Sequence, residues 1–143
     1  MEVSRVFLDT SAYSAYMAGY APVRQPIQEA SEVWLNVIVL GELLAGFKKG
    51  SRTRENERLL GEFLDEPRVR LATMDAETAE RYAVIRDHLR GAGKPVPVSD
   101  LWIAASAFQY GLELLTLDDH FRRIPQVVVD FVGPAPGEEG GSP

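Results

Sequence analysis

Short apolar runs alternate along this chain with longer segments in which apolar residues recur at helical spacing. The runs cover residues 3–8, 33–39, 69–74, 112–117 and 127–132. They are rich in β-branched and large apolar residues and are bounded by polar or turn-forming residues, which is typical of buried strands. We therefore expect a strand at each run.

Helices are expected between these strands. The first begins after Asp9 and carries four large residues at helical spacing: Tyr13, Tyr16, Met17 and Tyr20. Later helices are expected at residues 40–46, 51–65, 76–90 and 100–110, with a short helical turn through Phe121. Asp75 and Ser99 are suited to cap the helices that follow them, and Gly111 to end the last helix.

Prolines and glycines mark the connections. Pro22 and Pro26 punctuate the segment after the first helix, and residues 94–98 contain two prolines, which makes them a loop rather than a central strand. Residues 133–143, GPAPGEEGGSP, have the composition of a tail or linker. We expect one domain at residues 1–132, followed by this tail.

The alternation of strands and helices predicts an α/β fold, in which right-handed crossovers join parallel strands. Four acidic residues stand where these elements end or begin: Asp9, Glu42, Asp100 and Asp118. Ligands of parallel α/β folds bind beyond the carboxyl ends of the strands, so the four should meet at one edge of the sheet. Four carboxylates so close together would repel one another unless a divalent cation neutralised them.

This arrangement predicts a metal-dependent nuclease. Carboxylate oxygens around an open position suit Mg²⁺ or Mn²⁺. Two such ions about 4 Å apart can activate a water and stabilise the leaving oxygen when a phosphodiester is hydrolysed. Thr10, Ser11 and Thr116 adjoin the acids and are placed to orient carboxylates or metal-bound waters.

Each acid also has a structural interpretation. Asp9 is suited to cap a helix, and Asp100 to a first turn, where the helix dipole favours acids. Asp118 is suited to cap the turn before Phe121, and its neighbour Asp119 makes the choice between the two ambiguous. Glu42 is the hardest to explain structurally, because a buried acid among apolar residues needs a partner.

The charge balance permits a nucleic-acid partner without requiring one. The chain has 15 basic and 21 acidic residues, a net charge of −6, which would repel phosphates. Without the four acids and the tail pair Glu138 and Glu139, 15 acids face 15 bases, so the rest of the domain is neutral. Bound cations would partly reverse the sign of the acidic site.

Composition favours a single soluble domain in the cytoplasm. The chain has 143 residues, 45% of them hydrophobic and 25% charged, and no apolar run approaches the roughly 20 residues of a membrane span. Its first residues show no secretory leader. It has no cysteine, which fits a reducing compartment and excludes disulfides and thiolate sites.

Four motifs resemble those of the PIN-domain ribonucleases and, within them, the VapC toxins of toxin–antitoxin pairs. In family order they are FLDTS at 7–11, VIVLGEL at 37–43, SDLWIAA at 99–105 and LTLDDHF at 115–121. The resemblance runs from about Val6 to Val132. Any one motif alone is weakly specific, whereas four in order are strongly so.

The resemblance implies a three-layer sandwich, in which a parallel sheet of four to five strands is flanked by helices. It implies that Asp9, Glu42, Asp100 and Asp118 bind Mg²⁺ or Mn²⁺, with Thr10 or Ser11 and Thr116 as accessory residues. The implied activity is endonucleolytic cleavage of RNA, in many toxins of transfer or ribosomal RNA. The implied partners are a VapB-type antitoxin and a second copy of the chain.

Basic residues near these motifs are candidate contacts for RNA or for a partner. They are Lys48, Lys49, Arg52, Arg86, Arg90 and Lys94, although such residues more often form a solvated face. The alternatives are a housekeeping PIN nuclease and a PIN-like binding module without catalysis. A phosphoacceptor receiver domain is disfavoured, because Lys94 lies in a loop and a single Asp9 follows the first strand.

Overall fold

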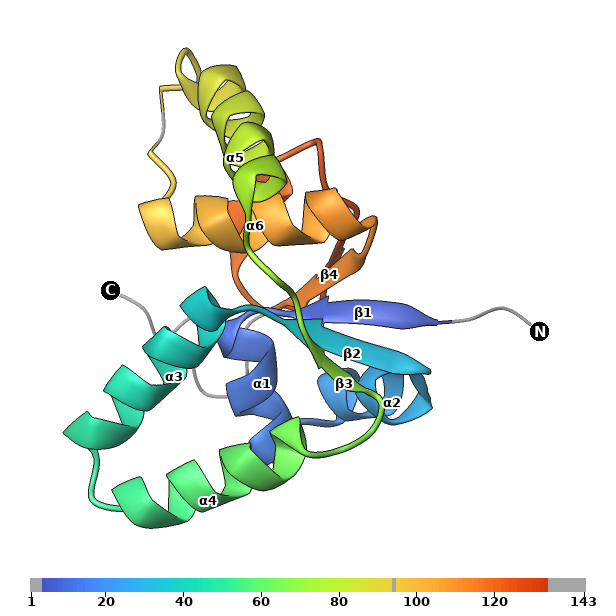
Figure 1. Cartoon of the computed structure of the whole chain (residues 1–143), viewed down its shortest axis with the longest axis vertical. Coiled ribbons are helices and arrows are strands. Elements are labelled where there is room, and N and C mark those ends of the chain that lie inside the picture. Colours follow the sequence, from blue (N-terminus) through green and yellow to red (C-terminus); the bar gives the residue numbers. More distant parts are fainter. Residues whose placement is uncertain (1–3, 94, 134–143) are drawn as a thin grey trace.

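One parallel sheet forms the centre of residues 4–93 and 95–133, which the computed structural model describes (Figure 1). Its five strands are β1 (Arg5–Leu8), β2 (Glu32–Leu35), β3 (Val69–Leu71), β4 (Glu113–Thr116) and β5 (Val129–Phe131). Their order is β3-β2-β1-β4-β5, and every neighbouring pair is parallel. The predicted parallel sheet of four to five strands is confirmed. Lys94 and residues 134–143 of the predicted tail lie outside the described residues.

Helices cover both faces of the sheet. They are α1 (Thr10–Met17), α2 (Ala21–Glu29), α3 (Val37–Lys49), α4 (Thr53–Leu64), α5 (Ala76–Leu89), α6 (Val98–Tyr110) and the 3₁₀ turn η1 (Asp119–Arg123). The chain steps from β1 to β2 and β3, then returns past β1 to β4 and β5. Right-handed crossovers in opposite directions put their helices on opposite faces, so α1 to α4 lie on one side and α5 and α6 on the other (Figure 1). The direction reverses between β1 and β4, where such folds open a crevice beyond the strand ends.

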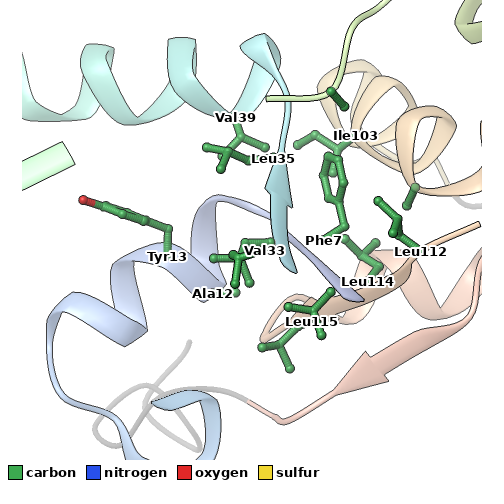
Figure 2. Close-up of a cluster of buried hydrophobic side chains, with 14 of the residues drawn as sticks. Phe7, Ala12, Tyr13, Val33, Leu35, Val39, Ile103, Leu112, Leu114 and Leu115 are labelled. Atoms are coloured by element: carbon green, nitrogen blue, oxygen red, sulfur yellow. The ribbon is translucent and has the colours of Figure 1, made fainter. Parts of the chain in front are cut away.

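The core fills both sides of the central strands. Alternate side chains of a strand point to opposite faces. Figure 2 shows Phe7 of β1 pointing toward Ile103 of α6, and Val33 of β2 beside Ala12 of α1 on the other side. All four are at most 1% exposed. Small residues at the middle of α6, Ala104, Ala105 and Ala107, are also buried, which lets this helix approach the sheet closely.

The second strand ends earlier than its apolar run predicts. β2 stops at Leu35, and Val37 is already the first residue of α3. Asn36 separates the two, because its Oδ1 accepts hydrogen bonds from the backbone N–H groups of Ile38 and Val39, both at 3.1 Å. The predicted strand at 33–39 is therefore wrong from residue 36 onward.

Two expectations about helix starts are also wrong. Residues 21–29, which were expected to be a connection, form the helix α2. Pro22 fits its first turn, where a backbone N–H has no partner within the helix. Val23 and Ile27 lie one turn apart and are fully buried. Pro26 lies inside this helix. Ser99 does not cap α6, which begins at Val98 after Pro97, with no side-chain cap. Asp75, in contrast, caps α5 as predicted, in a capping box with Thr78.

Asn36→Ala is expected to destabilise the protein by about 2–4 kcal/mol, because it removes a helix cap and leaves buried polar groups unpaired. Asn36 is fully buried, and its Nδ2 donates to Ser106 Oγ at 2.9 Å and to the Trp102 carbonyl at 3.3 Å, which ties α3 to α6. Urea unfolding would measure the loss. Ser106→Ala, which removes only one partner of Asn36, should cost less than Asn36→Ala. Equal losses would contradict the capping role.

No helix of the described residues is both long and apolar enough to cross a bilayer.

Candidate metal centre

The four predicted acids meet in one pocket of about 400 Å³ at the carboxyl edge of the sheet. Asp9 follows β1, Asp118 follows β4, Glu42 lies in α3, and Asp100 lies in the first turn of α6. The residues that line the pocket are Asp9, Thr10, Ser11, Ser14, Glu42, Asp100, Ile103 and Asp118. Residues more than 100 positions apart are adjacent here because β1 and β4 are neighbours in the sheet.

Asp9 combines a structural role with its place in the pocket. Its side chain caps α1 by accepting from the Ala12 N–H at 2.8 Å. It also accepts from Ser11 Oγ at 2.8 and 2.9 Å and from Thr116 Oγ1 at 2.6 Å. With only 3% of its surface exposed, this carboxylate is fixed by groups on both α1 and β4.

The hydroxyls beside Asp9 continue across to Asp118. Thr116 Oγ1 accepts from the Asp118 N–H at 2.8 Å, and Ser11 Oγ accepts from the Leu117 N–H at 3.0 Å. These bonds hold the start of η1 against α1. Ser11 and Thr116 therefore position the two acids that follow β1 and β4.

Glu42 is positioned by a hydroxyl from another helix. Thr10 Oγ1, in the first turn of α1, donates a short hydrogen bond to Glu42 Oε1. Glu42 is half-buried and lies in the second turn of α3, which Asn36 starts. All three hydroxyl residues predicted to be accessory thus contact an acid of the pocket.

Asp100 and Asp118 share a third neighbour, His120. Its Nδ1 lies 3.2 Å from Asp100 Oδ2 and 3.0 Å from Asp118 Oδ1. Each of the three residues offers an atom that lies within 4.8 Å of the other two, close enough to hold one cation.

Burial and mutual repulsion disfavour the charged forms of two acids. Burial raises the pKa of Asp9 to about 6, although hydrogen bonds from Thr116, Ala12 and Ser11 oppose the shift. Burial and the nearby charge of Asp118 raise the pKa of Asp100, also to about 6. Within the described residues, no lysine or arginine forms an ion pair with any of the four acids. Clustered carboxylates with no lysine or arginine partner fit a hard divalent cation, which would supply positive charge.

The structure gives Asp118 and its neighbour Asp119 different roles. Asp118 lines the pocket and caps η1 by accepting from the His120 N–H at 2.9 Å. Asp119 is exposed and pairs with Arg122 at 3.3 Å. Of these two neighbouring acids, Asp118 is therefore the one that belongs to the pocket.

Five of the six candidate basic contacts are in the described residues, and all five lie outside the pocket. Lys48 pairs with Glu57 at 3.5 Å, and Lys49 is exposed at the end of α3. Arg52 lines a groove of about 330 Å³ between α1, α3 and α4. Arg86 and Arg90 line a groove of about 600 Å³ between α5 and the start of α6. Lys94 lies outside the described residues.

The site residues predicted from the sequence omit Ser14 and Ile103, which line the pocket, and His120, which contacts Asp100 and Asp118. His120 stands two residues after Asp118, close enough to turn back on it through η1. Ser14 lies one helical turn after Thr10 and lines the pocket with it. That spacing was the available signal for Ser14.

Comparison with known proteins places this geometry in context. A family model described as PIN domain matches residues 6–127. Ribonuclease VapC4 of Mycobacterium tuberculosis is 32% identical over 131 residues, which cover 90% of this chain and 98% of that protein. Ribonuclease VapC5 of the same organism is 31% identical over 117 residues, covering 80% and 83%. The crystal structure of DNA-bound VapBC from Salmonella typhimurium has a chain that superposes with a TM-score of 0.76 at 25% identity, covering 91% of this chain and 98% of that one.

Proposed function

This chain belongs to the PIN-domain family, and we propose that it is a metal-dependent endoribonuclease that acts as the toxin of a toxin–antitoxin pair. The observation that carries the proposal is the pocket in which Asp9, Glu42, Asp100 and Asp118 meet without a lysine or arginine partner among the described residues. The similarity to proteins named ribonuclease, over most of both chains, gives this pocket its substrate class.

The proposed cofactor is Mg²⁺ or Mn²⁺, held by Asp9, Asp100, Asp118 and Glu42. Bound in pairs, such ions lower the pKa of an attacking water and neutralise charge on the phosphate and on the leaving oxygen. The buried acids Asp9 and Asp100 would form the inner part of the site. The half-buried acids Glu42 and Asp118 would face the substrate and its attacking water.

The hydroxyls of the pocket would keep the carboxylates in place. Ser11 and Thr116 fix both oxygens of Asp9, and Thr10 fixes one oxygen of Glu42. Because these donors belong to the ordered elements α1 and β4, the carboxylates of Asp9 and Glu42 are oriented before the substrate arrives. Catalysis then needs little reorganisation of the protein.

Affinity for RNA would come from the basic residues around the pocket, since no lysine or arginine of the described residues lines it. Arg86 and Arg90 are the best placed of these, because their groove also includes Val98 and Leu101, on either side of Asp100 in α6. A second basic group lies at or just after the C-terminal end of α3, away from Glu42, and would contact either RNA or a partner protein. It consists of Lys48, Lys49 and Arg52.

Two features support the proposed protein partners, a VapB-type antitoxin and a second copy of the chain. The groove between α1, α3 and α4 shares Ser14 with the acidic pocket, so a segment bound there would reach the acids. Helix α3 also leaves Val37 and Leu44 exposed, by 50% and 38%. Exposed apolar residues gathered on one helix are typical of a protein interface.

Removal of divalent cations is expected to abolish RNA cleavage. Purified protein would be incubated with a mixed single-stranded RNA in Mg²⁺, in Mn²⁺ and in excess chelator, and the products would be resolved on a denaturing gel. Cleavage should require a cation and return when the cation is restored, because four unneutralised carboxylates repel a phosphodiester. Undiminished cleavage in chelator would contradict the proposed function.

A further inference from the structure

We propose that His120 Nδ1 is a metal ligand, which together with Asp100 and Asp118 makes this site prefer Mn²⁺ over Mg²⁺. The inference deepens the proposed function, because it concerns the cation of the same pocket. It rests on the position of the imidazole, whose Nδ1 lies beside the carboxylates of both Asp100 and Asp118.

The distances around His120 suit ligands of one cation. In an octahedral site with bonds of about 2.1 Å, neighbouring ligand atoms are about 3.0 Å apart. His120 Nδ1 lies 3.0 Å from Asp118 Oδ1 and 3.2 Å from Asp100 Oδ2. The ligand atoms of Asp100, Asp118 and His120 all lie within 4.8 Å of one another. One cation can therefore contact all three with little movement of the side chains.

The backbone of η1 holds the imidazole at this place. The His120 N–H donates to Asp118 Oδ1, which closes the first turn of η1 around the carboxylate. Phe121 and Ile124, each 1% exposed, anchor the turn in the core. The His120 side chain is 39% exposed, so one edge of the ring faces the acids while solvent reaches the rest. A ring held in this way can exchange its contact with two carboxylates for a bond to a cation between them.

A nitrogen ligand changes which cation is favoured. Mg²⁺ strongly prefers oxygen, whereas imidazole suits transition metals, and affinity for mixed nitrogen and oxygen sites rises from Mn²⁺ to the later metals. A purely carboxylate pocket would discriminate less between Mg²⁺ and Mn²⁺. The substitution of one oxygen ligand by His120 therefore selects for Mn²⁺.

Nitrogen hyperfine coupling to bound Mn²⁺ provides a direct test, independent of RNA cleavage. The chain has two histidines, His88 and His120, so an untagged protein has two imidazoles in all. Pulsed electron paramagnetic resonance of Mn²⁺ bound to the wild type should show coupling to an imidazole nitrogen. The coupling should disappear in His120→Ala and persist in His88→Ala, since His88 is exposed on α5. Absence of the coupling from the wild type, or its survival in His120→Ala, would overturn the proposal.

Affinities measured by calorimetry give the second readout. His120→Ala should weaken Mn²⁺ binding by about tenfold or more, the scale of losses when groups around a metal site are removed, and weaken Mg²⁺ binding much less. Equal weakening of both would show that His120 only orients the carboxylates, and would overturn the proposal. Nitrogen coupling without RNA cleavage would refute the nuclease function and leave the ligand assignment intact. Metal-dependent cleavage without the coupling would refute the assignment of His120 as a ligand and leave the nuclease function intact.

Discussion

Asp9→Asn is expected to lower the rate of RNA cleavage by about 10³-fold or more, because a metal ligand contributes several kcal/mol to stabilising the transition state. The amide has the shape of the carboxylate and can still accept from the Ala12 N–H and contact Ser11 and Thr116. The fold should therefore survive while the charge is lost. Initial rates on a labelled RNA at saturating Mn²⁺ would measure the effect. Asp119→Asn, an exposed acid on η1, is the matched control and should keep full activity.

The same substitution should stabilise the metal-free protein at pH 7 by about 1–2 kcal/mol, because it removes a charge whose burial is unfavourable. The pKa of Asp9 is about 6 in the folded protein against 3.8 ordinarily, so the folded state binds the proton more tightly than the unfolded state. The wild type should thus lose stability as the pH rises from about 4 to 6, and Asp9→Asn should lose less. Thermal melts in chelator across this range would test the sign. A variant that is inactive but less stable than the wild type at pH 7 would indicate simple misfolding.

Expression of the wild-type chain in a bacterial host is expected to stop growth, and expression of Asp100→Asn is expected to have no effect. Asp100 is 8% exposed and contacts Asp118 through His120, so its loss should empty the pocket of its cation while changing little else. Growth curves and colony counts after induction would measure the difference, with Asp119→Asn as the variant that remains toxic. Equal amounts of soluble protein must be shown on gels.

Relief of the arrest would separate a toxin from a housekeeping nuclease. Co-expression of a small antitoxin-like protein encoded beside this gene should restore growth and form a complex that co-purifies with the chain. Normal growth of cells that contain abundant, folded wild-type protein would contradict the toxin role. It would leave the nuclease chemistry to be judged by the cleavage assay alone.

The sequence predicted the architecture well because its signals for strands are local. Val6, Phe7 and Leu8, like Leu114 and Leu115, are buried between two helical layers, and such strands are apolar on both faces. The positions of Asp9 and Asp118 at the ends of these strands followed from the rule for parallel sheets. The border between β2 and α3 did not follow, because Val37, Ile38 and Val39 continue the apolar run. A single polar residue, Asn36, decides where the helix begins.

Contacts between distant elements explain the features that the sequence did not reveal. Asp118 and Asp119 are neighbours that the sequence alone does not distinguish. In the structure the backbone N–H of Asp118 donates a hydrogen bond to Thr116 Oγ1, which places Asp118 at the pocket. His120 meets Asp100 across 20 residues, through the orientation of η1 relative to α6. Helix α2 contains two prolines and forms because Val23 and Ile27 are buried. Local preference is overridden at each of these places by tertiary packing.

The pairing of β1 with β4 has a consequence for the synthesis of the protein. On a ribosome, β1 emerges early and can pair with β2, but its other edge stays open until residues 113–116 have been made. The acids that follow the two strands can meet only after that event. The acidic pocket of a nascent chain is therefore incomplete until about four-fifths of the chain has been synthesised.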